Sequence, residues 1–197
     1  MLGSVETGGA IYRSGAQVGD EIWVTGTLGD AYAGLRVLQE EREEREAWEE
    51  KLIQHYLQPV PRVREALWLR STGFIHSMID LSDGLSSDLG HICQESRVGV
   101  RVEAAALPLS EETRRLAARR GEDPLEYALH GGEDFELCFT ASPGTIGPLV
   151  AQFRTRFALP LSRIGEVGPA AEPVLIKAGQ EVPLTPQGYD HFRKKRD

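Results

Sequence analysis

The sequence predicts a mixed α/β (α+β) fold, in which helices pack against a mixed β-sheet. Three observations lead to this prediction. Segments in which apolar and polar residues alternate, as in strands, are interspersed with segments whose apolar residues recur at helical spacing. Glycine and proline punctuate these segments, with 21 Gly and 11 Pro among 197 residues. The composition, 41% apolar and 26% charged, is typical of a chain that folds around a hydrophobic core.

The first strand is expected at residues 21–26, where Ile22 and Val24 alternate with Trp23 and Thr25. Residues 26–30 form a turn that lacks the lysine and the full glycine pattern of a P-loop, so we interpret it as a closely packed helix entry. The helix that follows has an apolar face of Leu28, Tyr32, Leu35 and Leu38. We expect it to continue through the charged run 40–51, either as a solvated face with i,i+4 Glu–Arg support or as an interaction surface.

The middle of the chain continues the alternation of strands and helices. Pro59 and Pro61 predict a loop between two helices, and residues 74–81 predict a strand. The next helix is opened by residues 82–84. Its apolar stripe is Leu85, Leu89 and Ile92. A strand with alternating valines follows at 98–102, and then a helix that Ser110 caps and Gly121 ends.

The last third of the chain completes the predicted sheet. Phe135, Leu137 and Phe139 alternate as a strand directly after residues 131–134. The strongest helical stripe comprises Ile146, Leu149, Val150, Phe153 and Phe157. Closing strands are expected at 164–167 and in a hairpin over 174–184 that turns at 178–180. No repeat or linker divides the chain, so residues 1–197 are expected to form one domain.

Composition excludes several classes of protein. The net charge of −8, from 22 basic and 30 acidic residues, disfavours a nucleic-acid partner. No apolar run reaches the roughly 18 residues of a membrane span, and residues 1–9 lack the pattern of a secretory signal. Cys93 and Cys138 have no C-x-x-C spacing, which disfavours a disulfide framework or a cysteine zinc site. We therefore expect a cytoplasmic protein without a membrane partner.

Asp80-Leu81-Ser82-Asp83-Gly84 is the most informative stretch for chemistry. Two carboxylates lie three residues apart where a strand ends and a helix begins, and ligands collect at such strand ends. Carboxylates repel a phosphate directly but can bind it through Mg²⁺, which accepts one or two protein carboxylates. The alternative is that Ser82 or Asp83 serves only as the helix N-cap.

Residues 131–134, Gly-Gly-Glu-Asp, form a second candidate. Paired glycines allow close backbone approach to a ligand, although a turn with two solvated acids is equally consistent with the pattern. Arg13 could pair with a phosphate or be a surface charge, and Tyr189 could stack on an aromatic ligand or close the core. None of the five histidines lies in a motif that supports Ser–His–Asp catalysis.

Five segments in the same order resemble thiamine-monophosphate kinase, of the aminoimidazole ribonucleotide synthetase superfamily. The segments are 13–26, 80–89, 131–137, 164–167 and 188–192. The resemblance implies the superfamily's C-terminal domain, with residues 1–20 as a joining segment and an N-terminal ATP-binding domain absent. It implies transfer of the ATP γ-phosphate to thiamine monophosphate with Mg²⁺ and a family homodimer whose interface lies largely in that absent half.

The resemblance also implies a role for particular residues. Asp80 and Asp83 would bind the metal, with Asp83 also the catalytic residue. Arg13 and Ser82 would contact ATP, which is the co-substrate. Glu133 and Tyr189 would contact thiamine monophosphate. We expect the isolated chain to be inactive, because two aspartates cannot assemble the whole metal cluster. Two alternatives remain: another enzyme of the superfamily, such as a selenophosphate synthetase or a hydrogenase-maturation protein, or a non-catalytic partner module.

Overall fold

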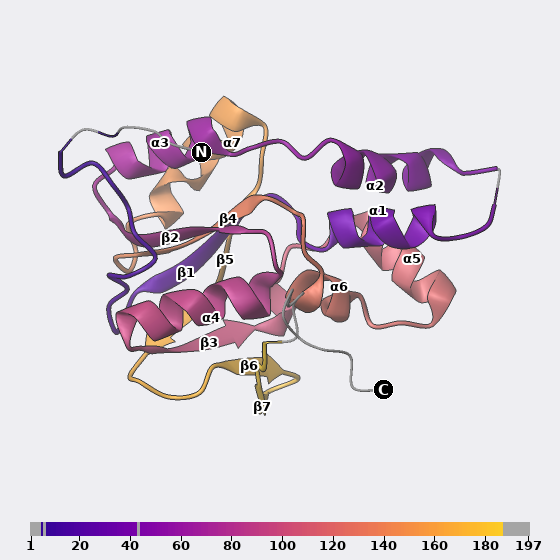
Figure 1. The fold of residues 1–197 in the computed structure, drawn as a ribbon. Coiled ribbons are helices and arrows are strands. Elements are labelled where there is room, and N and C mark those ends of the chain that lie inside the picture. The colour runs from indigo at the N-terminus through magenta and orange to yellow at the C-terminus, as the bar shows by residue number, and fades with distance from the viewer. Residues whose placement is uncertain (1–4, 6, 43, 187–197) are drawn as a thin grey trace.

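A seven-stranded mixed sheet forms the centre of the molecule, in a computed structural model that describes residues 5, 7–42 and 44–186 (Figure 1). The strand order is β2-β4-β1-β5-β3-β6-β7. All neighbouring strands are antiparallel except β3 and β6, so the predicted mixed sheet is confirmed. The strands are β1 Glu21–Thr25, β2 Ile75–Leu81, β3 Gly99–Glu103, β4 Glu136–Ala141, β5 Leu161–Gly168, β6 Val174–Lys177 and β7 Gln180–Pro183.

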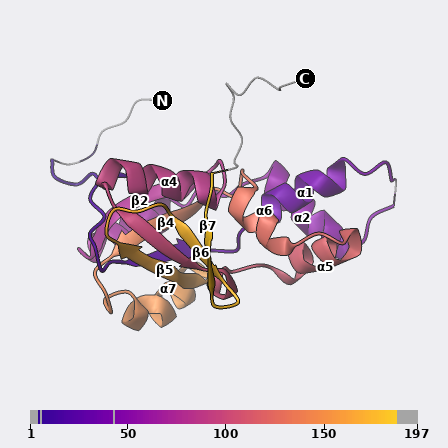
Figure 2. The same ribbon diagram turned by 90° about the horizontal axis from the view of Figure 1, so that it is seen from below.

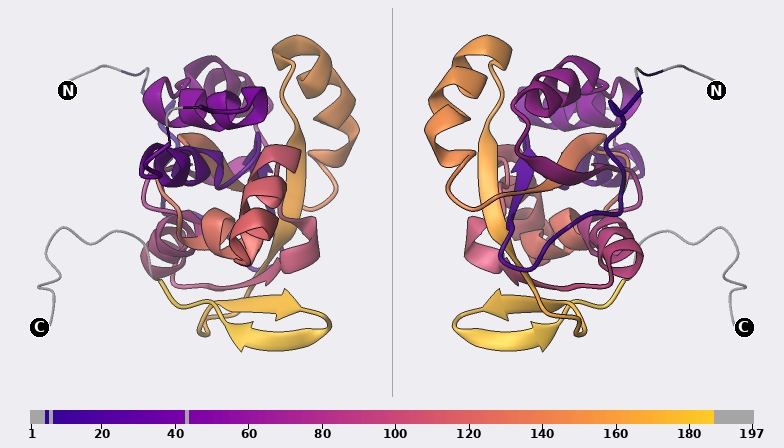
Figure 3. Two further views of the ribbon diagram at one scale, coloured as in Figure 1. Left: turned by 90° about the vertical axis from the view of Figure 1, so that its right-hand side faces the viewer. Right: turned by 90° about the vertical axis from the view of Figure 1, so that its left-hand side faces the viewer.

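Helices cover both faces of the sheet, and a group of helices lies beside it. Figure 2 shows α4 and α7 on opposite sides of the sheet, while α1, α2 and α5 gather at one end. Figure 3 shows the β6–β7 hairpin at the sheet's far edge. The α-helices are α1 Asp30–Leu38, α2 Ala47–Leu57, α3 Val63–Ser71, α4 Leu85–Ser96, α5 Glu111–Arg120, α6 Pro124–His130 and α7 Val150–Phe157. Two 3₁₀ turns span Ala104–Ala106 and Gly147–Leu149.

Three clusters of buried apolar side chains hold these layers together. The largest lies between α4 and the sheet and includes the predicted stripe of Leu85, Leu89 and Ile92. A second joins α3 and α7 to the other face of the sheet through Leu69, Phe139 and Phe153. The third lies among α1, α2, α5 and α6. Because burial of apolar surface is the main favourable term in folding, each cluster stabilises its own layer contact.

The predicted continuation of the first helix through residues 40–51 is wrong. Helix α1 ends at Leu38 and α2 begins at Ala47, with Glu46 as its N-cap. The Glu49 side chain accepts a hydrogen bond from the Glu46 backbone N–H at 2.8 Å, and the Glu46 side chain accepts one from the Glu49 N–H. This capping box starts a new helix, which folds back against α1. Periodicity could not reveal the break, since glutamate and arginine are good helix formers.

Two glutamates of this run, Glu40 and Glu49, are directed toward α5, while most of its other charged residues are exposed. Glu49 is fully buried and pairs with Arg42 and with Arg119 of α5. Glu40 pairs with Arg42, Arg119 and Arg120. The interpretation as a solvated face therefore holds for the exposed members of the run, whereas Glu40 and Glu49 cross-link α5 to α2 and to the segment before it.

Other local predictions are confirmed. Ser110 caps α5 by accepting from the Thr113 N–H at 3.0 Å, and Gly121 ends that helix with φ +67°. The β6–β7 hairpin turns at Ala178 and Gly179, both with positive φ. Helix α6 was not predicted, although Asp123-Pro124 is a typical helix start: the Asp123 side chain accepts from the Leu125 N–H. Within the described part of the chain, no helix is long and apolar enough to cross a membrane.

Candidate functional site

The two candidate motifs lie side by side at one end of the sheet. Strands β2 and β4 pair so that Leu81 is opposite Glu136, which brings the end of β2 next to the start of β4. The Glu133 N–H donates to the Ser82 carbonyl at 2.9 Å, and the Phe135 N–H donates to the Leu81 carbonyl at 2.8 Å. The structure therefore brings together the predicted residues Asp80, Ser82, Asp83 and Glu133, which are separated by about fifty residues in the sequence.

Gly132 permits this close approach. A Cβ at Gly132 would lie 2.4 Å from the Ser82 carbonyl oxygen, a distance at which the two loops could not stay in contact. The sequence interpretation assigned the paired glycines to approach of a ligand. The structure shows that Gly132 allows its loop to pack against residues 82–83 instead.

The loop that carries Glu133 has a strained backbone. Glu133 has φ +72° and Phe135 has φ +50°, in the left-handed region that side chains rarely adopt. Each such residue costs on the order of 1–3 kcal/mol, and such outliers cluster at functional sites. The side chain of Glu133 is exposed, so the strained loop presents a carboxylate to solvent beside residues 80–83.

A buried carboxylate, Asp88, holds the other loop. Its Oδ2 accepts the backbone N–H groups of Ser82 and Asp83, each at 3.0 Å. The N-cap of α4 is Gly84, without a side-chain cap, so the interpretation of Ser82 or Asp83 as the N-cap is wrong. Burial raises the pKa of Asp88 to about 6, and the charges of Asp83 and Asp80 act in the same direction.

Asp80 and Asp83 offer the kind of ligand that Mg²⁺ takes. Asp80 is exposed and Asp83 half-buried at the carboxyl end of β2, and carboxylate oxygens suit this hard cation. Within the residues described here, no group of three or more His, Cys, Asp or Glu side chains is arranged to hold a metal ion. Asp80 and Asp83 would be the residues to hold such an ion here, which suits a cation that takes only one or two protein carboxylates.

Asp134 connects the same site to the helical group. Its carboxylate accepts the N–H of Gly29 at 2.6 Å and that of Ala31 at 3.1 Å, and thereby caps the first turn of α1. Burial raises the pKa of Asp134 to about 8. A Cβ at Gly29 would lie 2.7 Å from the Tyr127 backbone, which confirms residues 26–30 as a closely packed helix entry.

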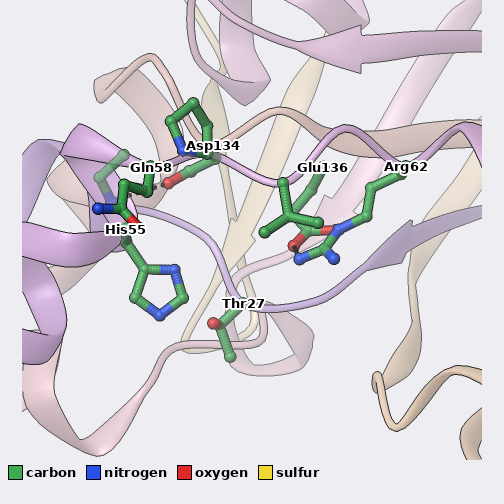
Figure 4. Close-up of a pocket in the computed structure, with 9 residues that line it drawn as sticks. Thr27, His55, Gln58, Arg62, Asp134 and Glu136 are labelled. Carbon is green, nitrogen blue, oxygen red and sulfur yellow. Dashed lines mark hydrogen bonds and ion pairs between the residues drawn. The ribbon is translucent and has the colours of Figure 1, made fainter.

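A small cleft is lined in part by Asp134 and Glu136 (Figure 4). It encloses about 350 Å³ of empty volume, including open solvent. Arg62 donates to both carboxylate oxygens of Glu136, at 3.0 and 2.6 Å, and the Thr25 hydroxyl donates to Glu136 as well. The lining residues are Thr27, Ala31, His55, Gln58, Pro59, Val60, Arg62, Asp134 and Glu136. The guanidinium group of Arg62 and the carboxylate of Glu136, both labelled in Figure 4, are thus hydrogen-bonded to each other.

Sequence reasoning did not find the roles of Asp88, Asp134 and Glu136. Asp88 and Glu136 lie inside the motifs, but nothing in their spacing shows that their partners are backbone amides or an arginine 74 residues away. The one available signal was the clustering of acids around residues 80–88 and 133–136, which exceeds what two metal ligands require.

The structure does not bring Arg13 to these residues. Arg13 pairs with Glu95 at 3.0 Å, and its carbonyl accepts from the Ser96 hydroxyl at 3.3 Å. Both partners lie in the last turn of α4, a helix of 12 residues that spans about 18 Å. The contact of Arg13 with a nucleotide therefore stays a prediction. Tyr189 lies outside the described residues.

A hydrogen-bonded chain of Asp20, His76 and Ser142 was also not predicted. Asp20 and His76 Nδ1 lie 2.9 Å apart, and His76 Nε2 and the Ser142 hydroxyl lie 3.3 Å apart. The buried Asp20 also accepts the Gln17 N–H at 2.9 Å. The chain joins the segment before β1, the start of β2 and the end of β4. It is at the opposite end of β2 from residues 80–83, and we assign it a structural role.

Residues 17–177 match the family described as AIR synthase related protein, C-terminal domain. The chain belongs to this family. The match confirms the fold that the motif resemblance implied, and the boundaries of the AIR synthase related domain enclose both loops of the site. At the level of fold alone, a hydrogenase maturation protein, HypE of Escherichia coli, is also similar, with a TM-score of 0.72 at 19% identity.

Among its relatives, this AIR synthase related domain is similar to thiamine-monophosphate kinases. It is 42% identical over 192 residues to the thiamine-monophosphate kinase of Escherichia coli K12, which covers 96% of the chain and 58% of that protein. The crystal structure of thiamine-monophosphate kinase from Stenotrophomonas maltophilia has a TM-score of 0.79 at 40% identity, over 90% of the chain and 56% of that protein. These matches confirm the predicted resemblance.

One similar structure is described as AaThiL complexed with AMPPCP and TMP. It has a TM-score of 0.79 at 36% identity and covers 92% of the chain and 54% of that protein. The chain thus spans a little more than half the length of the relatives that it matches.

Proposed function

We propose that the chain forms the C-terminal part of an ATP-dependent kinase that phosphorylates thiamine monophosphate to thiamine diphosphate. The observation that carries this proposal is the juxtaposition of residues 80–83 with Glu133 across β2 and β4. It places two candidate cation ligands beside a candidate substrate carboxylate. The 42% identity to a thiamine-monophosphate kinase supports the choice of substrate.

In this proposal each site residue has a separate task. Asp80 and Asp83 hold Mg²⁺, and Asp83 is the catalytic residue through the ion that it binds. Ser82 contacts ATP and Glu133 contacts thiamine monophosphate. Arg13 contacts the nucleotide and Tyr189 stacks on the thiamine rings. For Arg13 this requires that the nucleotide-binding surface extend to the other end of α4, or that the residue act at a second site in a homodimer.

The residue types suit transfer between two phosphates. The acceptor phosphate has a second pKa near 6 and is ionised at neutral pH, so the protein needs no strong base. The obstacle is repulsion between polyanions, and bound Mg²⁺ supplies the neutralising charge. Asp88 already occupies the N–H groups of Ser82 and Asp83, so a phosphate cannot use these donors directly. The carboxylates of Asp80 and Asp83 therefore favour contact with phosphate through a cation, in a direct in-line transfer.

We propose further that catalysis needs an ATP-binding half that these 197 residues do not include. The chain covers 58% of its E. coli relative, and its described residues provide fewer than three grouped metal ligands. That further half would also carry most of a homodimer interface. The proposal includes a cytoplasmic location, with which the two free cysteines agree.

A chimera tests the proposal. The matching part of the E. coli thiamine-monophosphate kinase is replaced by this chain, and thiamine diphosphate formation from ATP and thiamine monophosphate is measured. We expect turnover by the chimera, none by the 197-residue chain alone, and a loss of at least about 100-fold in Asp83→Asn. Glu103→Gln, at an exposed site on β3, serves as the matched control and should stay active.

Two results would argue against the proposal. A folded chimera that binds nucleotide but does not phosphorylate thiamine monophosphate would favour another enzyme of the superfamily. Unchanged turnover in Asp83→Asn would remove that residue from the site. Robust turnover by the isolated chain would contradict only the need for the second half.

A further inference from the structure

Asp88 is a buried carboxylate whose role the proposed metal ligands do not explain. It lies in the first turn of α4 and is only 2% exposed. Its Oδ2 accepts two backbone N–H groups, from Ser82 and Asp83, at 3.0 Å each. An oxygen that accepts two neighbouring amides fixes the orientation of both peptide planes, since each bond is directional.

The surroundings of Asp88 disfavour its charge. Asp88 is almost fully buried, and the carboxylates of Asp83 and Asp80 lie near it. Ser110, the N-cap of α5, accepts an N–H of its own helix, whereas Asp88 lies inside α4 and accepts N–H groups of the residues that precede it. The hydrogen bonds of Asp88 therefore tie the first turn of α4 to the loop before it.

The peptides that Asp88 holds are those of the loop that presents the proposed ligands. The Ser82 carbonyl meanwhile accepts from Glu133, so the backbone at Ser82 is fixed on both sides. Gly84, with φ +100°, follows directly and leads the chain into α4. With its N–H groups held, the loop has little freedom, and the direction of the Asp83 side chain follows from it, while Asp80 is held in β2 opposite Leu137.

We propose that Asp88 is the positioning residue of the loop that follows β2: it fixes the backbone of Ser82 and Asp83 so that the carboxylate of Asp83 converges with that of Asp80, at the end of β2, on one cation. The proposal rests on the proposed function for the identity of that cation. Asp88 acts through Ser82 and Asp83 and does not touch the ligand. It also keeps phosphate off the two N–H groups that it occupies.

The test compares two substitutions in the 197-residue chain. Asp88→Asn removes the charge but keeps an oxygen that can accept both N–H groups. Asp88→Leu removes charge and acceptor at similar volume, and Asp88→Ala is the second variant if the leucine variant does not fold. Ser110→Ala, which removes the cap of α5, is the matched control for a general loss of stability.

Two measurements by nuclear magnetic resonance separate the steps. Hydrogen exchange of the Ser82 and Asp83 amides reports whether Asp88 holds the loop. We expect exchange about tenfold faster in Asp88→Leu, and unchanged in Asp88→Asn and Ser110→Ala. Line broadening by Mn²⁺ reports whether the loop presents a cation site. We expect broadening centred on residues 80–84 in the unmodified chain and in Asp88→Asn, and its loss in Asp88→Leu.

The outcomes discriminate between the two proposals. Unchanged exchange in Asp88→Leu would overturn the positioning role, and so would faster exchange with an unchanged Mn²⁺ pattern. Absence of localised broadening in the unmodified chain would argue against the metal role of Asp80 and Asp83, and with it the purpose assigned to Asp88. In that case the exchange data would still show whether the loop is held.

Discussion

At the residue scale, three carboxylates of this chain, Asp88, Asp134 and Glu49, differ in the partners that they have. Asp88 and Asp134 accept backbone N–H groups, and burial raises the pKa of both, to about 6 and about 8. Glu49 instead lies against two guanidinium groups. Burial alone would raise its pKa, but the Glu46 N–H, Arg119 and Arg42 lower it to about 2. At Glu49 the Glu46 N–H is the largest of the lowering causes and the guanidinium groups add to it, whereas at Asp88 and Asp134 the backbone amides do not outweigh desolvation.

Glu49→Gln is expected to lower the free energy of unfolding by about 1–2 kcal/mol at pH 7, a value reduced because Arg42 and Arg119 are partly exposed. The carboxyl pKa is lower in the folded state than in the unfolded state. The contribution of Glu49 to the free energy of unfolding is therefore complete above about pH 4.5, and it is lost as the pH falls toward 2.

Urea unfolding of the two proteins at several pH values measures this difference, with the exposed neighbour Glu50→Gln as control. The stabilities of the Glu49→Gln variant and the unmodified chain should converge near pH 2. A difference that persists at pH 2, or an equal loss in Glu50→Gln, would contradict the assignment.

At the scale of elements, the contact between α1 and α2 depends on a glycine. A Cβ at Gly34 would lie 2.0 Å from the Leu52 carbonyl oxygen, so the two helices approach at backbone distance. In α4, by contrast, a Cβ at Gly90 would meet only Pro186, at 3.7 Å. Both glycines are helical, with no positive φ, so the two sites differ in packing and not in backbone conformation.

Gly34→Ala should therefore destabilise the chain by about 1–3 kcal/mol, because overpacking outweighs the gain in helix propensity. Gly90→Ala should be neutral or stabilise it by up to about 1 kcal/mol for the propensity alone. Thermal and urea unfolding, followed by circular dichroism, give both values. A stabilising Gly34→Ala would show that α1 and α2 are less closely packed than the structure has them.

At the scale of the whole molecule, the clusters of the sheet layers also enclose both cysteines. Cys93 lies on the inner side of α4 and Cys138 on β4, and both are buried and free. Burial raises the pKa of the Cys93 thiol to about 11 and that of Cys138 further. Since the thiolate is the reactive form, both burial and protonation protect these groups.

We expect neither thiol to react rapidly with an aromatic disulfide reagent at pH 8 in the folded chain, and both to react in concentrated urea. The native labelling rate should follow the opening of the core and rise in Gly34→Ala if that variant loosens the whole molecule. Rapid labelling of one thiol in the folded chain would show that the layer between α4 and the sheet opens locally.

The type and order of nearly all elements can be predicted from the sequence, because apolar periodicity and turn residues act over a few positions. The sequence also picked out residues 80–84 and 131–134, whose composition is unusual wherever they lie. It did not determine that the charged run breaks between Leu38 and Ala47, since helix propensity is high throughout and the break depends on α2 packing back onto α1.

Which side chains meet depends on how the chain folds back on itself in three dimensions. The pairing of β2 with β4 sets residues 80–83 beside Glu133, and the length of α4 keeps Arg13 away from them. The partners of Asp88, Asp134 and Glu136 are likewise fixed by how the chain folds back on itself. Hydrogen bonds and ion pairs act over a few ångströms of space, and distance along the sequence does not show which groups come within that range.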